Sequence, residues 1–431
     1  MEIQKAIQHI ENGGFSAIFS RLYGEEEETL AYQKKRYLDA VKRFCELYPE
    51  QRDIRIFSAP GRTEIGGNHT DHQHGCVLAA AVNLDIIAVV SFNNMGVIRL
   101  QSEGHSPNNV NLSDLSVRDD EKGSSSALIR GIAAKFREKG VEVCGFDAYT
   151  TSSVLSGSGL SSSAAFEILV GTIIDRHYNN GKAGAVEIAK IGQYAENVYF
   201  GKKSGLMDQM VSSVGGLVSI DFHDTKNPKI QSFPFDFENA GYCLCVTGTK
   251  GSHADLTEDY VAIRSEMEGI AAQFGKSYLR DVNENDFYRA IPQLREKISD
   301  RAVMRAAHFF AENKRAVQEA NALSDENMDC FLELVKQSGE SSANLLQNLY
   351  SCSQPTQQAL SIGIMLSKRI LGEKGAVRVH GGGFAGTIQA FVPTDKANEY
   401  VNEMNRVFGD GSCYVLKIRS TGGVEITEGL L

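Results

Sequence analysis

A short segment at 60–75 concentrates residues whose side chains could do chemistry. It reads PGRTEIGGNHTDHQHG and carries an arginine, a glutamate, an asparagine, an aspartate and three histidines. Closely spaced histidine and aspartate can bind zinc, but their order here does not match the alternating ligands of zinc hydrolases. Donors and acceptors without sulfur also suit a ligand rich in hydroxyl groups, each of which needs a partner. We therefore favour a polyhydroxylated ligand, with a solvated polar loop as the alternative.

A second segment, at 154–165, could bind a polyphosphate. It reads VLSGSGLSSSAA, and its glycines Gly157 and Gly159 would let a ligand approach the backbone closely. Residues 161–165 would form the first turn of a helix, where free N–H groups and the helix dipole favour phosphate. The alternative is a serine- and glycine-rich loop in which a serine caps the helix.

Two better-known phosphate motifs are not matched. A Walker A loop ending in the Gly-Lys-Ser of 275–277 would need glycine at the position of Ile270. The segment GGGFAG at 381–386 has the GxGxxG spacing, but β-like sequence follows it near the C-terminus. A dinucleotide fingerprint instead opens a helix after an early strand. We therefore expect a turn between two strands at 381–386.

The composition excludes several function classes. The chain has 431 residues and a formal charge of −10, so we expect no nucleic-acid partner and no anionic membrane surface as partner. The eight cysteines form no CxxC pair, which favours thiols in a reducing compartment. The N-terminal residues are too polar for a signal peptide, and no apolar run reaches about 18 residues. We expect a cytoplasmic protein.

The hydrophobic pattern predicts the elements that position these segments. Helices are expected at 1–50, 124–139, 161–177, 184–200, 255–274 and 284–370. Strands are expected at 54–60, 77–82, 86–92, 146–151, 216–222, 242–247, 377–380 and 387–392. Strands frame helices in both halves, which indicates a two-domain chain of mixed α and β structure. We place the boundary near residue 222, which gives domains 1–222 and 223–431.

Taken together and in this order, the three segments resemble the GHMP small-molecule kinases, and most closely their galactokinase branch. The resemblance spans most of the chain. It implies an α+β fold of two domains, the first similar to domain 2 of ribosomal protein S5 and the second ferredoxin-like, with the active site between them. It also implies that ATP and Mg²⁺ are the cofactors and that a small sugar is the substrate.

The resemblance further implies roles for single residues. In the segment GLMDQ at 205–209, Asp208 would be the base for the sugar C1 hydroxyl, and Arg62 would stabilise charge beside it. Ser163 and Glu196 would bind magnesium. The implied sugar-binding residues are Asn68, His69, Asp71, Gly205 and Tyr260. The implied ATP-binding residues are Gly157, Ser158, Gly159, Leu160, Ser161, Ser162, Ser163 and Ala164. Structural alternatives are a helix cap or salt bridge for Asp208, an exposed helix position for Glu196 and a helix anchor for Tyr260.

The chain departs from the galactokinase pattern within the first segment. Asn68 stands where the family has a glutamate that faces the sugar C6 hydroxyl, Glu64 replaces an asparagine and Gly66 replaces an isoleucine. An amide both donates and accepts hydrogen bonds, so it tolerates a hydroxymethyl group or a carboxylate at C6. We favour galactose 1-phosphorylation by ATP, with galacturonate or another hexose as alternative substrates. A non-catalytic sugar sensor is disfavoured, because Ser163 and Ala164 are both present.

Overall fold

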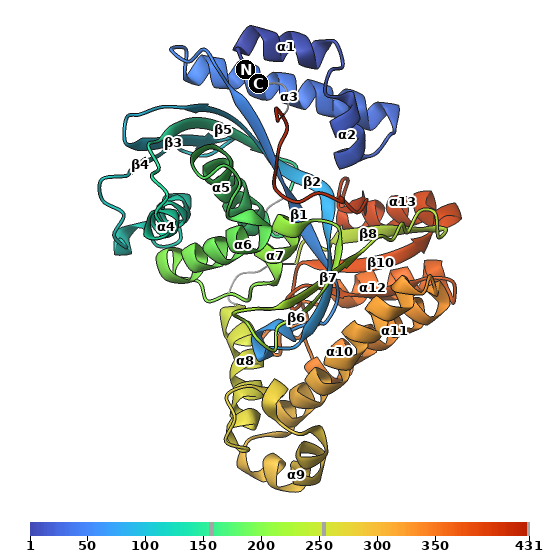
Figure 1. Ribbon diagram of the computed structural model, residues 1–431. Coiled ribbons are helices and arrows are strands. Elements are labelled where there is room, and N and C mark those ends of the chain that lie inside the picture. Colours follow the sequence, from blue (N-terminus) through green and yellow to red (C-terminus); the bar gives the residue numbers. More distant parts are fainter. Residues whose placement is uncertain (155–158, 252–255, 429–431) are drawn as a thin grey trace.

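The computed structural model describes residues 1–154, 159–251 and 256–428. Gly157 and Ser158 of the expected ATP loop therefore lie outside the described residues. Two sheets and the helices on their faces make up the fold (Figure 1), and the predicted α+β class is confirmed. Within the described residues, no helix is both long enough and apolar enough to cross a membrane.

The larger sheet is built around two long antiparallel strands. Its members are β1 (Arg55–Gly66), β2 (Cys76–Phe92), β3 (Val97–Ser102), β4 (Asn108–Asn111), β5 (Phe146–Ser152), β6 (Leu217–Asp221), β7 (Lys229–Phe233) and β12 (Val424–Glu425). The main path runs β12-β1-β2-β5-β3-β4, while β6 joins β2 and β7 joins β6. The chain end returns to this sheet, because Glu425 of β12 pairs with Phe57 of β1.

Helices cover both faces of the larger sheet. One face carries α4 (Ser125–Glu138), α5 (Ser162–Tyr178), α6 (Gly184–Tyr194), the π-helix η3 (Ala195–Phe200) and α7 (Met207–Val214). The other face carries α1 (Ile3–Glu11), α2 (Ser16–Tyr23) and α3 (Glu27–Leu47). Successive strand residues point to opposite faces, so on β2 Ile87 and Val89 pack against α1–α3 whereas Ala88 and Val90 pack into the other core.

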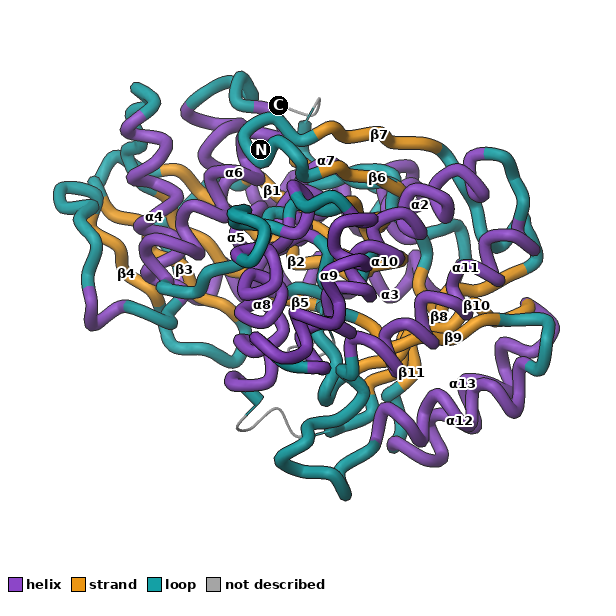
Figure 2. Tube along the Cα trace, turned by 90° about the horizontal axis from the view of Figure 1, so that it is seen from below, coloured by secondary structure: helices purple, strands orange, loops and turns teal. Residues whose placement is uncertain are grey.

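The smaller sheet comprises β8 (Tyr242–Gly248), β9 (Ala376–His380), β10 (Thr387–Pro393) and β11 (Cys413–Leu416) in the order β11-β8-β10-β9. Helices separate β8 from β9 and β10 from β11, which is the connectivity expected of a ferredoxin-like domain. The helices of this half are α8 (Thr257–Ala272), α9 (Glu284–Lys297), α10 (Asp300–Ser324), α11 (Met328–Ser341), α12 (Ala359–Leu371) and α13 (Ala397–Phe408). In Figure 2, α12 and α13 lie side by side beyond the strands.

Two sequence-based predictions about strands were wrong. The segments expected as separate strands at 77–82 and 86–92 are one strand, β2, and the expected polar loop after residue 60 continues β1 as far as Gly66. In both places polar residues led us to expect a solvent-exposed break in the strand. These residues are instead buried and form ion pairs, as Asp85 and Glu64 show. The predicted boundary at 222 stays a prediction; β7 beyond it still pairs with β6.

A buried charge cluster fastens α2, α3 and the chain end to β1 and β2. Asp85 is fully buried and accepts hydrogen bonds from Arg36 at 2.6 Å, Arg419 at 3.0 Å and Tyr23 at 2.5 Å, and also from Ser58. Burial acts to raise the pKa of Asp85, but the two arginines and the hydroxyl donors outweigh it and the pKa is lowered. The aspartate is therefore ionised at neutral pH.

We predict that Asp85→Asn destabilises the fold by about 3–5 kcal/mol, because two buried arginines lose their counter-ion. The free energy of unfolding in urea measures this loss. In the wild type this free energy should decrease as the pH falls through the lowered pKa of Asp85, because protonation removes the same charge. Asp39→Asn, which removes a carboxylate that is 57% exposed on α3, is the control and should change stability by less than about 1 kcal/mol. Equal effects of the two substitutions would contradict the role of Asp85.

Candidate active site

An ion pair between β1 and α7 lies at the centre of the candidate site. Arg62 Nε donates to Asp208 Oδ1 at 2.7 Å, and Arg62 Nη1 donates to the carbonyl oxygen of Gly159. Asp208 lies in the first turn of α7, and Ser161 Oγ donates to its other carboxylate oxygen. The structure thus brings the two predicted catalytic residues together with the end of the predicted ATP loop.

The environment of Asp208 keeps it ionised while leaving it accessible. Burial acts to raise the pKa of Asp208, but Arg62 and Ser161 outweigh burial and the pKa is lowered. The side chain of Asp208 is 28% exposed, whereas that of Arg62 is 8% exposed. A negative charge that a ligand can reach is therefore held in place by an arginine that is largely buried.

The chain from Gly159 onward packs directly on β1. Arg62 N donates to Leu160 O at 3.0 Å, and a Cβ on Gly61 would lie only 2.8 Å from that same oxygen. The backbone of Ser161 adopts the left-handed conformation, with φ of 55°, and its side chain does not cap α5. The serine-cap alternative is therefore wrong for Ser161. Ser162 and Ser163 form the first turn of α5, where unpaired N–H groups favour an anion, and Ala164 behind them is buried.

A buried amide links two glutamates beside this centre. Gln209 Nε2 donates to both Glu196 Oε2 and Glu167 Oε2 at 2.9 Å. Glu167 follows Ser163 by one helical turn on α5, so these two residues share a helix face. Glu196, which is only 3% exposed, is therefore not the exposed helix residue that was the alternative. The predicted metal ligands Ser163 and Glu196 lie on neighbouring elements that Glu167 and Gln209 connect.

The oxygen atoms of this cluster fit magnesium. Glu196 Oε2 is occupied by Ser204 and Gln209, whereas Oε1 contacts only Lys202 Nζ at 3.0 Å among the described residues. Burial, with the nearby charge of Glu196, raises the pKa of Glu167 well above its ordinary value. No group of three histidine, cysteine or acidic residues in the described part of the chain could enclose a metal. Magnesium suits such a site, because it keeps waters and phosphate oxygens as most of its ligands.

Two of the predicted sugar-binding residues are in close contact. A Cβ on Gly205 would lie 2.0 Å from Asp71 Oδ2, so only glycine leaves room for this carboxylate. Burial, with the charges of Asp208 and Glu64, raises the pKa of Asp71 to about 6. Because Gly205 precedes Asp208 by three residues and lies against Asp71, the first segment and the ion pair between Arg62 and Asp208 belong to one site.

The glycine-rich turn at 381–386 joins β9 to β10, as expected, and contacts two other predicted sugar-binding residues. His69 Nε2 lies 3.0 Å from Gly382 O, and Tyr260 Oη donates to Gly383 O at 2.9 Å. The Tyr260 ring packs edge-on against Phe384, with centroids 5.4 Å apart. Tyr260 therefore anchors α8 to the turn, as the alternative to a sugar-binding role proposed. The anchor lies beside the predicted sugar site.

Asn68 is fully buried, and its side-chain amide is used within the protein. Its Nδ2 donates to Glu64 Oε1 at 3.0 Å and Gly381 O at 2.6 Å, while its Oδ1 accepts from Asn348 at 2.9 Å and Ser342 at 3.3 Å. These four bonds fill the capacity of an amide. A sugar could contact the amide of Asn68 only by replacing one of these bonds, and such a contact stays a prediction. Glu64, in turn, pairs with the buried Arg378.

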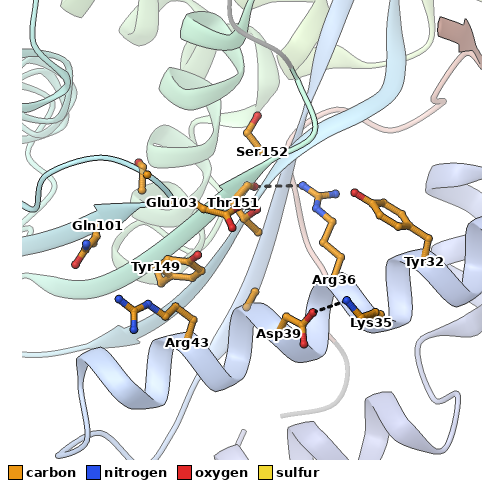
Figure 3. A pocket seen from close by; sticks show the side chains of 13 residues that line it. Tyr32, Lys35, Arg36, Asp39, Arg43, Gln101, Glu103, Tyr149, Thr151 and Ser152 are labelled. Carbon is orange, nitrogen blue, oxygen red and sulfur yellow. Dashed lines mark hydrogen bonds and ion pairs between the residues drawn. The ribbon is translucent and has the colours of Figure 1, made fainter. Parts of the chain in front are cut away.

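A separate pocket of about 550 Å³ lies on the α3 face of the larger sheet (Figure 3). It is lined by residues of α3 and of the strand ends near Gln101 and Tyr149, and none of the predicted site residues is among them. Its three cations are already paired: Arg36 with Asp85, Lys35 with Asp39 at 3.4 Å and Arg43 with Glu46 at 2.6 Å. The pocket is therefore distinct from the candidate active site.

Sequence reasoning did not identify three residues of the site. Glu167 and Gln209 carry the amide link, and Lys202 contacts Glu196. A usable signal existed for two of them, since Lys202 lies between Glu196 and Asp208 in the sequence and Gln209 directly follows Asp208. Glu167 gave no such signal, because a glutamate within an apolar helix is not distinctive.

Comparisons with known proteins agree with this geometry. The model of the galactokinase galactose-binding signature matches residues 42–92, and that of the GHMP kinase N-terminal domain matches residues 127–216. The galactokinase of Actinobacillus pleuropneumoniae serotype 5b (strain L20) is 30% identical over 373 residues, covering 86% of this chain and 92% of the relative. The Streptomyces coelicolor galactokinase is 32% identical over 348 residues, covering 80% and 86%.

Solved structures show the same fold. Lactococcus lactis galactokinase complexed with galactose superimposes with a TM-score of 0.76 at 22% identity, covering 89% of this chain and 98% of that one. Methanococcus jannaschii mevalonate kinase has a TM-score of 0.61 at 16% identity, covering 85% and 98%. From the sequence identity over nearly the full length of curated relatives, together with this fold, it follows that the chain belongs to the galactokinase family of the GHMP kinases.

Proposed function

We propose that this protein transfers the γ-phosphoryl group of ATP to the C1 hydroxyl of galactose. The observation that carries the proposal is the carboxylate of Asp208, which Arg62 holds ionised and which Ser161 Oγ contacts from the ATP loop. Phosphoryl transfer needs positioning and charge stabilisation more than covalent help from the protein. The substrates are small molecules, and we place the reaction in the cytoplasm.

Asp208 would act on the acceptor hydroxyl. The position now taken by Ser161 Oγ at Asp208 Oδ2 marks where a sugar hydroxyl could donate, and the carboxylate would then accept its proton as the phosphoryl group arrives. Arg62 keeps Asp208 deprotonated and stabilises charge on the acceptor oxygen. On the sugar side, His69 and Asp71 would bind hydroxyl groups, with Gly205 leaving space for Asp71 and Tyr260 closing the site.

The phosphates would lie at the start of α5. The N–H groups of Ser162 and Ser163, with the helix dipole, favour the negative oxygens of ATP, and Gly157 to Ala164 would form the loop around them. Ser163 and Glu196 would hold Mg²⁺, which would neutralise charge on the β- and γ-phosphates. Gln209 and Glu167 orient Glu196 for this role.

We predict that Asp208→Asn lowers kcat by at least 100-fold, because an amide of the same shape cannot accept the proton. Galactose and ATP should still bind, which calorimetry measures beside the coupled ADP-release assay. Asp224→Asn, on an exposed turn, is the control and should keep its kcat. A kcat of Asp208→Asn within about tenfold of wild type, a loss near 1.4 kcal/mol, would contradict the base role.

We predict that Ser163→Ala and Glu196→Gln each raise the Mg²⁺ concentration that gives half-maximal turnover. Each substitution removes or weakens an oxygen ligand. Steady-state rates at saturating sugar and ATP, measured across a magnesium titration, give the shift, and Ser162→Ala is the neighbouring control. Unchanged magnesium dependence in both variants would mean that neither residue binds the metal.

We predict that Asn68→Asp raises the KM for galactose by at least tenfold and lowers stability. The new carboxylate would face Glu64, and two such charges about 4 Å apart repel by about 4 kcal/mol at a dielectric near 20. The double variant Glu64→Gln, Asn68→Asp removes this repulsion and should recover most of the loss. Additive effects in this double-mutant cycle would show that residues 64 and 68 do not act as a pair.

A substitution at residue 68 also tests the choice of sugar. If the charge near residue 68 determines what is accepted at C6, Asn68→Glu should suppress turnover of galacturonate more than turnover of galactose. The ratio of the two kcat/KM values measures the effect. An unchanged ratio would agree with the internal hydrogen bonds of Asn68 and would mean that another residue faces C6.

A further inference from the structure

We propose that Lys202 is a further catalytic residue of this site and that its ammonium group binds the γ-phosphate of the phosphoryl donor. The proposal rests on the proposed function, since it names a contact within the same phosphoryl transfer. In the structure the ammonium contacts Glu196 Oε1, at 3.0 Å.

The backbone of Lys202 is fixed close to the reacting groups. Its N–H and that of Gly201 both donate to Glu196 O, at 3.1 and 3.0 Å, where the π-helix η3 ends. Gly201 adopts φ of 89°, which lets the chain reverse there at no cost to a side chain. The base of the lysine side chain is therefore anchored, while its flexible stem leaves the ammonium free to turn.

The contact with Glu196 can be exchanged for another. The side chain of Lys202 is 60% exposed whereas that of Glu196 is 3% exposed. Glu196 Oε1 has no other partner among the described residues, and a magnesium ion bound to it would repel the ammonium and neutralise the charge that now holds it. Donor binding with magnesium on Glu196 would therefore release a charged group beside the phosphates.

The charges around Lys202 favour a phosphate as its next partner. Lys202 carries an ammonium group, and the carboxylate that now holds it accepts a hydrogen bond from Gln209, the residue after Asp208. The ammonium is therefore connected through Glu196 and Gln209 to the segment that carries the proposed base. Arg62 already pairs with Asp208. Charge that develops on the transferring oxygens would thus meet a second cation at Lys202.

The alternative is an ordinary surface ion pair between Lys202 and Glu196, which would contribute little. The two interpretations differ in how they depend on the γ-phosphate. A residue that contacts this phosphate distinguishes a triphosphate from a diphosphate, whereas a counter-ion of Glu196 affects both nucleotides alike. Lys203, the next residue, is exposed and forms no ion pair within the described part of the chain, so it supplies a matched control.

The test compares Lys202→Met with Lys203→Met in the full-length protein. Calorimetry measures the affinities for magnesium-loaded AMP-PNP and for magnesium-loaded ADP. We expect Lys202→Met to weaken AMP-PNP binding at least tenfold, to change ADP binding less than twofold and to lower kcat at least 100-fold. Lys202→Arg, which keeps the cation, should recover part of both losses, and Lys203→Met should match wild type.

Two results would overturn the proposal. One is a loss of equal factor for AMP-PNP and ADP in Lys202→Met, and the other is a change of less than twofold for both. Unfolding temperatures of all variants identify loss of fold, and Lys202→Arg still tests the contact if Lys202→Met does not fold. If wild type phosphorylates no sugar but discriminates AMP-PNP from ADP through Lys202, the proposed function fails and the assignment of Lys202 stands.

Discussion

The ion pair between Arg62 and Asp208 is the constraint on which the active-site arrangement depends. Arg62 lies on a central strand and Asp208 at the start of a helix, and the same guanidinium also holds the carbonyl oxygen of Gly159. The strand, the helix and the residues Gly159 and Ser161 of the predicted ATP loop are thereby fixed relative to one carboxylate. Such pairs stabilise a site only when further hydrogen bonds satisfy the two charged groups; here Gly159 O accepts from Arg62 and Ser161 Oγ donates to the second carboxylate oxygen of Asp208.

A second buried charge supports the loop from the opposite face of the sheet. Arg36 bonds both Asp85 and the carbonyl oxygen of Thr151, while Ser153 exchanges hydrogen bonds with the backbone of Asp85. The strand that leads into the phosphate loop is therefore tied to helix α3. The catalytic face and the structural face of the sheet are joined through polar contacts as well as through apolar packing.

The sequence predicted the parts of the site that depend on local residue type. The helix after the predicted ATP loop and the turn at 381–386 follow from local motifs, whereas the proximity of Arg62 and Asp208 was implied by the resemblance to the galactokinases. What could not be predicted are pairings between distant segments outside the family motifs. Asp85 suggested a break in β2 because its partner Arg419 lies 334 residues away. Nothing in the sequence near Asn68 indicated that the distant Asn348 and Gly381 bond its amide, whose contact with a sugar stays a prediction.

The return of the C-terminal segment to β1 has a consequence for biosynthesis. Arg419 is synthesised 334 residues after Asp85, yet it completes the charge cluster around that aspartate on β2. Until Arg419 has emerged from the ribosome, the nascent sheet holds an aspartate with one of its two arginines missing. The N-terminal sheet should therefore remain incompletely folded until the segment around Arg419 has been made.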